Sequence, residues 1–171
     1  RVQVVFEERS VRARVELPAH VDVRAIPTRI AAVRRWLDLD ASPARIDEDL
    51  SRDPALGEVV RRVPGLRVLG ALDPFRTLTS TIVSQQVSVA AAATQNGRLC
   101  DLITGGERFP TAVELAARDP DEVAGALGIP RRRGRALVEV AELVGSAAVD
   151  LSAGADRDAV LGRLGQVAGI G

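Results

Sequence analysis

The sequence predicts an α+β fold, in which a partial small antiparallel sheet with helices precedes an all-helical unit. Three observations lead to this prediction. Residues 2–17 alternate apolar and polar side chains, residues 27–53 show helical periodicity, and the chain from residue 73 onward is a succession of helical segments separated by turns. A stretch rich in Gly and Pro, RVPGLRVLGALDP, separates the two parts, so we divide the chain into residues 1–62 and residues 63–171.

The first part begins with two alternating runs on either side of the polar segment EERS at residues 7–10. The apolar positions are Val2, Val4 and Phe6 in the first run and Val11, Ala13, Val15 and Leu17 in the second. Period-two alternation around a polar connection predicts an antiparallel hairpin. Two strands alone are marginally stable in water, so we expect missing strands or the next helix to complete this sheet.

Helical segments follow, and several begin with a capping residue. Ser42 precedes Pro43, Asp73 precedes Pro74, and Ser88 opens a segment that ends at two glycines. We expect helices at residues 27–40, 42–53, 73–84, 88–103, 111–117, 120–127, 130–144 and 156–167.

The composition limits the partners that this chain can have. All 23 basic residues are Arg and 23 residues are acidic, so no global basic field attracts nucleic acid, and any such contact must be local. A single Cys offers neither a disulfide nor a cysteine metal cluster, which fits the cytoplasm. No apolar stretch approaches a membrane span, so we expect no membrane partner. Because the chain starts with Arg1 and stops inside a turn, we expect it to be a fragment.

The glycine turn VAGIG at residues 167–171 is the first candidate binding element. Gly169 and Gly171 flank one apolar residue, and such a turn can leave backbone N–H groups free to bind a phosphate. Gly is also common where a helix simply ends in the left-handed conformation. For these five residues alone, a helix C-cap is the better explanation.

A second candidate is the pair of amides in IVSQQVSV. Gln85 and Gln86 lie between a helix that ends near Ser84 and a helix that Ser88 can cap. Capping and solvation alone would explain them. Alternatively, a long uncharged amide at such a turn can enter a duplex and fill the gap left by an extruded base.

The only concentrated positive charge is PRRRGRAL at residues 130–137. Successive positions point in different directions around a helix, so Arg131, Arg132 and Arg133 cannot all serve one site. A solvated helix face is the usual explanation for such a run.

Three segments together resemble the helix-hairpin-helix DNA glycosylases, most closely the bacterial DNA-3-methyladenine glycosylase II group. They are DPFRTLTSTIVSQQVSVAAA, FPTAVELAARDPDEVAGALGIPRRRGRALVEVA and LGRLGQVAGIG, in the order and near the spacing of that family. The resemblance implies that residues 63–171 are the N-terminal part of a helix-hairpin-helix glycosylase domain that is truncated at the hairpin. It also implies that residues 1–62 are the remnant of a preceding sheet and helix domain.

The resemblance implies roles for individual residues. Gln86, with Gln85 beside it, matches the wedge that fills the vacated space, and Val167, Gly169 and Gly171 match the hairpin that contacts DNA. The carbonyl groups of Gly165, Val167 and Ile170 match a site for a monovalent cation, Na or K, and no cofactor is required. The family's catalytic Asp would lie beyond Gly171, so we expect no catalytic residue in this chain. Ala168 stands where the family usually has Pro.

Three functions of different classes remain open. The first is a monofunctional DNA glycosylase that flips an alkylated base of the 3-methyladenine type from double-stranded DNA and hydrolyses its glycosidic bond, acting as a monomer. The second is a non-catalytic DNA-binding module, for example a degenerate glycosylase-like domain of an adaptive-response regulator. The third is a helical interaction domain that binds no nucleic acid.

Overall fold

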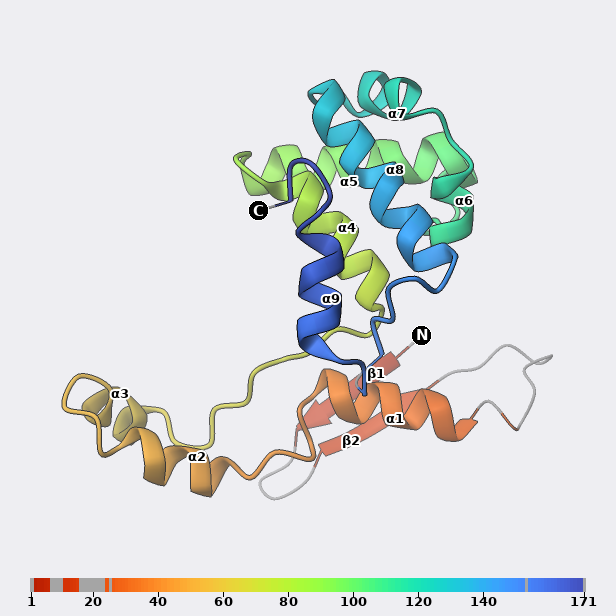
Figure 1. Cartoon of the computed structure of the whole chain (residues 1–171). Helices are drawn as coiled ribbons and strands as arrows, with labels where there is room; N and C mark the ends of the chain where they lie inside the picture. Colours follow the sequence, from red (N-terminus) through yellow and green to blue (C-terminus); the bar gives the residue numbers. More distant parts are fainter. Residues whose placement is uncertain (1, 7–10, 16–23, 25, 153, 171) are drawn as a thin grey trace. The chain divides into compact units, whose positions relative to one another are not determined.

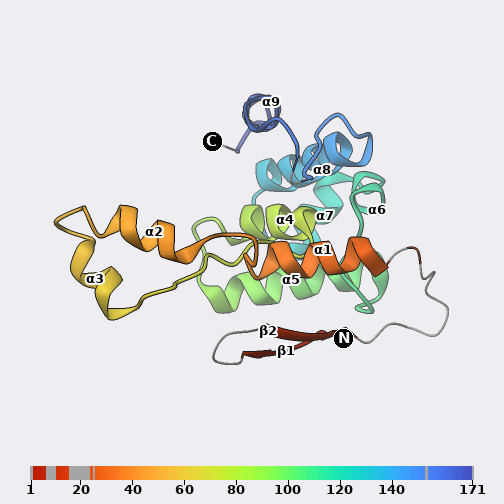
Figure 2. The same ribbon diagram turned by 90° about the horizontal axis from the view of Figure 1, so that it is seen from below.

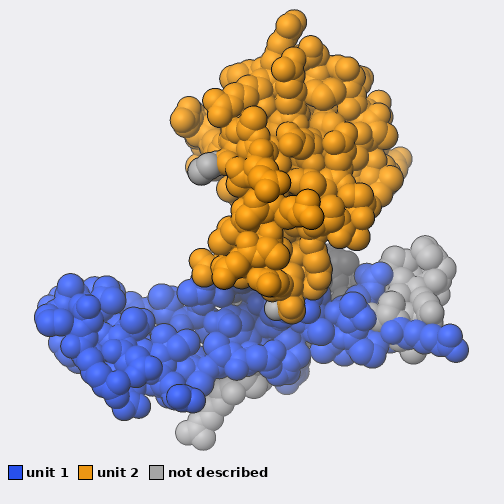
Figure 3. Space-filling view, viewed as in Figure 1, with its two compact units in different colours: residues 1–72 blue, residues 73–171 orange. Residues whose placement is uncertain are grey.

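A computed structural model describes residues 2–6, 11–15, 24, 26–152 and 154–170 (Figure 1). The chain forms two compact units, Arg1–Leu72 and Asp73–Gly171, which Figure 3 distinguishes by colour. No helix in the described part of the chain is both long and apolar enough to cross a membrane. The assignment of residues 1–62 and 63–171 to the remnants of two larger domains stays a prediction.

The first unit contains the two strands of the described residues. Strand β1, Val2–Phe6, pairs antiparallel with β2, Val11–Val15, and Figure 2 shows the two side by side. Their register places Val2 opposite Val15 and Phe6 opposite Val11. The alternation in the sequence therefore predicted this local pairing correctly. Residues 7–10 and Leu17 lie outside the described residues.

The predicted α+β class is wrong, because the described part of the chain is almost entirely helical. It holds nine helices, against two strands of five residues each. No strand side chain that the structure describes belongs to the hydrophobic core, and that of Val5 is 47% exposed. A two-stranded ribbon has no central strand and cannot form a layer with its own core. The apolar surface of this chain is buried between helices instead.

Three helices complete the first unit: α1, Ile26–Trp36; α2, Pro43–Leu50; and α3, Gly57–Arg62. Val33 and Leu37 are buried, whereas Ile30, which has the same helical spacing, is 51% exposed. Ser42 occupies the N-cap position of α2, but its side chain makes no capping hydrogen bond. Pro43 at the first position thus marks the start of α2 without help from the serine hydroxyl.

The second unit consists of six helices: α4, Pro74–Ser84; α5, Val89–Thr104; α6, Ala112–Ala116; α7, Pro120–Leu127; α8, Arg131–Gly145; and α9, Arg157–Leu164. Helix α8 packs against α4, α6 and α7, as Figures 1 and 2 show. The core contains Ile82, Leu99, Leu115, Leu127 and Leu137, each at most 1% exposed. This helical core holds the ends of α4, α8 and α9 in place.

Side-chain caps fix where several of these helices begin. The carboxylate of Asp73 accepts a hydrogen bond from the backbone N–H of Arg76 at 3.0 Å, and Ser88 Oγ accepts one from the N–H of Ala91 at 3.2 Å. Both caps were predicted from the sequence. Such a cap satisfies one of the unpaired N–H groups at a helix start and contributes about 1 kcal/mol.

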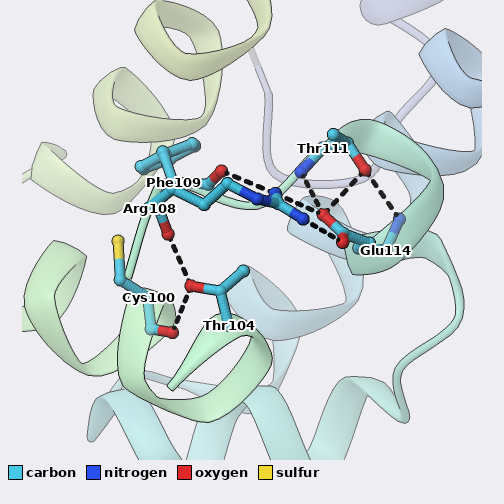
Figure 4. Close-up of polar contacts among 6 residues, drawn as sticks. All are labelled: Cys100, Thr104, Arg108, Phe109, Thr111 and Glu114. Atoms are coloured by element: carbon cyan, nitrogen blue, oxygen red, sulfur yellow. Dashed lines mark hydrogen bonds and ion pairs between the residues drawn. The ribbon is translucent and has the colours of Figure 1, made fainter. Parts of the chain in front are cut away.

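A polar cluster ties the loop after α5 to α6 (Figure 4). Arg108 donates two hydrogen bonds to the carboxylate of Glu114, at 2.8 and 2.5 Å. Glu114 also accepts from the backbone N–H and the hydroxyl of Thr111, both at 2.9 Å, and Thr111 caps α6 in return. At the other end of the loop, the Thr104 hydroxyl donates to the carbonyl oxygen of Arg108 at 2.5 Å. The hydrogen bonds from Arg108 first, and those from Thr111 next, lower the pKa of Glu114 from its ordinary value of 4.5 to about 2.

We expect Glu114→Gln to lower the melting temperature at neutral pH. A carboxyl whose pKa is lowered in the folded state stabilises that state above pH 4.5, and this contribution disappears as the pH falls towards 2. The difference in melting temperature between the variant and the parent should therefore shrink across that interval. Thermal unfolding followed by circular dichroism at pH 7, 4.5 and 2.5 measures it. Glu139→Gln, at an exposed position on α8, is the control, and parallel pH profiles for Glu114→Gln and the parent would contradict the expectation.

Candidate functional site

The turn between α4 and α5 carries the two glutamines. Gln85 is half-buried and ends α4, whereas Gln86 is exposed and has a φ of 59°. The left-handed conformation costs a residue with a side chain roughly 1–2 kcal/mol. Such conformations persist where the surrounding structure enforces them, and they are concentrated at functional sites. The backbone therefore presents the Gln86 side chain to solvent at a local cost.

The second element is the turn that follows α9. Val167 is buried at 1% exposure, and its carbonyl oxygen accepts a hydrogen bond from the N–H of Ile170 at 3.1 Å. Gly169 lies between them with a φ of 108°, a value that residues with side chains rarely adopt. Gly169 is thus required by the backbone itself. Gly171 lies outside the described residues.

The side chain of Arg132 runs along this glycine turn. A Cβ placed on Gly169 would lie 3.3 Å from Arg132 Nε and 3.7 Å from Arg132 Cγ. Helix α8, which carries Arg132, therefore contacts the turn after α9 through this arginine. The glycine leaves room for that contact.

The two turns and the start of α8 together line a hollow of about 680 Å³. Figure 1 shows the α4–α5 turn and the turn after α9 at the same end of the second unit. The lining residues are Gln85, Gln86, Pro130, Arg132, Arg133, Gly169 and Ile170. The structure thus brings together four of the predicted site residues, Gln85, Gln86, Gly169 and Ile170, from segments about eighty residues apart. Val167 packs into the core instead, and Gly165 is exposed outside the lining.

The sequence interpretation missed Arg132 and Arg133, which it assigned to a solvated face. Both line the hollow, while Arg131 points elsewhere, with its Nε 3.9 Å from a carboxylate oxygen of Asp121. The expectation that the three arginines do not serve one site agrees with this arrangement. One feature of the sequence could have indicated their role: the three arginines stand at the very start of a helix, directly after Pro130.

The charge around the hollow is positive and local. Its lining holds two guanidinium groups and two neutral amides, and none of these residues is an Asp or Glu. Within the described residues, no three His, Cys, Asp or Glu side chains gather as a set of metal ligands. A concave surface with this lining suits an anionic ligand that has hydrogen-bonding groups.

The family comparison assigns this helical unit to the helix-hairpin-helix class of domains. The chain belongs to the HhH-GPD superfamily of base excision DNA repair proteins, whose sequence model matches residues 79–166. Residues 1–73 match the AlkA N-terminal domain.

Curated relatives agree with this family. The chain is 34% identical over 161 residues to a probable bifunctional transcriptional activator/DNA repair enzyme AlkA of Mycobacterium tuberculosis, covering 88% of this chain and 31% of that protein. It is 32% identical over 151 residues to DNA-3-methyladenine glycosylase 2 of Escherichia coli, covering 83% of this chain and 50% of the relative. The chain therefore spans 31% and 50% of the length of these two relatives.

A solved structure shares the fold. The 8-oxoguanine glycosylase/lyase of Clostridium acetobutylicum in its apo form aligns over 99% of this chain and 59% of its own, with a TM-score of 0.71 and 19% identity. The same enzyme in complex with double-stranded DNA aligns with a TM-score of 0.69. At this identity the likeness concerns the fold alone.

Proposed function

We propose that this chain is the DNA-binding part of a DNA glycosylase that removes alkylated bases of the 3-methyladenine type from double-stranded DNA. The observation that carries the proposal is the hollow in which the Gln86 turn, the Gly169 turn and two arginines meet. Membership of a base excision repair superfamily supports the same function, as does the name of the Escherichia coli relative. A fold shared with a glycosylase that has been solved on double-stranded DNA supports the partner. The protein acts as a monomer in this proposal.

Gln86 and the hairpin have complementary tasks in this proposal. The Gln86 amide can both donate and accept hydrogen bonds, so it can occupy the gap left by an extruded base and satisfy the edge of the base opposite. Gln85, the half-buried residue before Gln86, also lines the hollow and contacts the DNA in this proposal. In the proposal the turn offers the backbone N–H groups of Gly169 and Gly171 to a phosphate. Val167, whose own N–H donates to the carbonyl oxygen of Leu164 at 3.1 Å, anchors this DNA-binding turn in the core. DNA would thus be held by its backbone on one side of the hollow and distorted on the other.

The reaction in this proposal is hydrolysis without a covalent amine intermediate. An alkylated base that carries positive charge is a good leaving group, and a carboxylate can stabilise the positive charge that develops on the sugar. The 171 residues contain no Lys that could form a Schiff base. The hollow is lined by no Asp or Glu, and the proposal follows the family resemblance in placing the catalytic Asp beyond Gly171.

A monovalent cation at the hairpin is a further part of the proposal. The carbonyl oxygens of Gly165, Val167 and Ile170 are neutral, hard ligands of the kind that Na⁺ and K⁺ accept. The carbonyl of Val167 already accepts the Ile170 N–H, but a second lone pair remains for a cation. Bound there, the cation would add positive charge to the turn that faces the phosphate.

We expect Gln86→Gly to remove the wedge without harming the fold. Gly adopts a φ of 59° without strain, so the melting temperature should stay equal or rise. The parent should bind a duplex with an abasic-site analogue better than an intact duplex, because the amide fills the gap. We expect this preference to fall roughly 2- to 10-fold in Gln86→Gly, the value of about one hydrogen bond. Fluorescence anisotropy with both duplexes measures the ratio.

Gln86→Asn is the matched variant for this test. Asn tolerates the left-handed conformation and keeps the amide, although it is one methylene shorter. It should retain part of the preference for the abasic duplex. If Gln86→Gly preferred the abasic duplex as strongly as the parent does, Gln86 would not be the residue that fills the gap.

We expect no base release by the 171-residue chain from methylated duplex DNA. Removal of a charged group that stabilises a transition state typically lowers the rate by on the order of 10² to 10³ or more. A chimera that continues after Gly171 with the Escherichia coli relative's residues beyond its matched segment should release the free base. Chromatography of the released bases, with the relative itself as positive control, gives the answer. Turnover by the short chain would place the carboxylate within it, whereas a chimera that binds DNA but stays inactive would favour the non-catalytic module.

A further inference from the structure

Three consecutive arginines open helix α8, and they have different surroundings. Arg131 is 79% exposed, with its Nε 3.9 Å from Asp121. Arg132 is exposed and Arg133 half-buried, and both line the hollow beside Gln85, Gln86 and Gly169. The hollow is therefore lined by two of the three arginines.

These charges lie where they disfavour the helix. The N-terminus of a helix carries a partial positive charge, and each cation in the first turn opposes it by roughly 0.3–1 kcal/mol. Helix α8 has no acidic residue in its first turn to offset this charge; the same is true of α4 and α5, but α8 begins with three arginines. The first turn of α8 thus combines the helix dipole with three guanidinium groups. An anion bound in the hollow would relieve this repulsion.

Arg132 also touches the hairpin itself. Its Nε and Cγ lie 3.3 and 3.7 Å from where a Cβ on Gly169 would stand, so the same side chain lies against the turn after α9 and lines the hollow. A guanidinium group has a rigid, planar set of donors that can bind two phosphate oxygens at once. Arg132 is therefore placed to hold the turn and a phosphate together.

We infer that Arg132 and Arg133 bind phosphate groups of the DNA backbone in this hollow, and that Arg131 does not. The inference rests on the proposed function, since it names the side chains that supply the charge for DNA binding. It explains how a chain without net charge can bind a polyanion, because two local guanidinium groups take the place of a basic surface. It also assigns different roles to the three consecutive arginines.

The salt dependence of DNA binding tests this inference. Each phosphate that a protein neutralises contributes about 0.9 to the slope of log affinity against log salt concentration. We expect Arg132→Gln and Arg133→Gln each to reduce the magnitude of that slope by about 0.9, and the double variant by about 1.8. Arg131→Gln is the matched control and should leave the slope of the parent unchanged. Anisotropy titrations of the full 171-residue chain with an intact duplex, at several salt concentrations, provide the slopes.

A second readout separates lost binding from lost folding. Because the two substitutions remove unfavourable charge from the first turn of α8, the variants should melt at the same temperature as the parent or higher. The inference would be overturned if Arg132→Gln and Arg133→Gln kept the slope of the parent, or if Arg131→Gln reduced the slope as much as they do. Either result would leave the DNA binding of the parent chain unaffected. A parent chain that fails to bind duplex DNA would instead overturn the proposed function.

Discussion

Gly134→Ala should strongly destabilise the second unit, because the added methyl group has no room between two packed helices. A Cβ on Gly134 would lie 2.4 Å from the carbonyl oxygen of Pro120 and 2.8 Å from the Cβ of Ala124. The nearer atom belongs to the backbone of α7, so α7 and α8 would have to move apart. Overpacking of this kind typically costs roughly 1–3 kcal/mol, and we expect the upper end for Gly134→Ala. The gain in helix propensity from Gly to Ala, about 1 kcal/mol, offsets only part of it.

The matched control is Gly125→Ala on α7, where no atom beyond its chain neighbours and the backbone of its own helix lies within 4 Å of the added Cβ. This variant should melt at the same temperature as the parent or slightly higher. Thermal unfolding should show Gly134→Ala melting on the order of 10 °C lower. Equal melting temperatures for the two variants would mean that α7 and α8 are not in such close contact.

The second large effect concerns DNA binding and Gly169. At a φ of 108° an Ala residue is strained by roughly 1–3 kcal/mol, and its Cβ would also press on Arg132 at 3.3 Å. If the turn must keep this shape to bind a phosphate, affinity for duplex DNA should fall roughly 5- to 150-fold in Gly169→Ala. Anisotropy at a fixed salt concentration measures the loss.

Gly162→Ala serves as the control for that experiment. Gly162 lies within α9, and no atom beyond its chain neighbours and the backbone of α9 is within 4 Å of its added Cβ, so helix and turn should both be preserved. The control should bind DNA as the parent does. Equal affinity for Gly169→Ala and the parent would show that the glycine turn does not contact DNA.

Local patterns predicted the helices of the second unit better than they predicted the fold class. Asp73 and Ser88 cap the helices that the sequence assigned to them, because capping depends on neighbouring backbone groups only. The alternating segment also forms its hairpin. The class failed because two strands were taken as part of a sheet layer, a property that depends on tertiary partners rather than on alternation.

The candidate site was predictable only in part, for a similar reason. Gln86 and Gly169 stand out in the sequence as amides and glycines at turns. Their meeting at one hollow, with Arg132 and Arg133, depends on how α8 packs against α7 and on the turn after α9. Neither the positive φ of Gln86 nor the direction of each arginine follows from residue type. Such features come from packing and have no local signature.

Chemical-shift mapping of the backbone amides during titration with a short DNA duplex tests most directly whether this hollow is the DNA-binding site. The ¹H–¹⁵N spectrum of the 171-residue chain resolves each element of the hollow separately. We predict that the largest shift changes occur at Gln86, Arg132, Arg133 and Gly169. Small changes are expected at α6, which does not line the hollow. Shift changes centred on other helices, with the Gln86 and Gly169 signals unmoved at saturating DNA, would contradict the account.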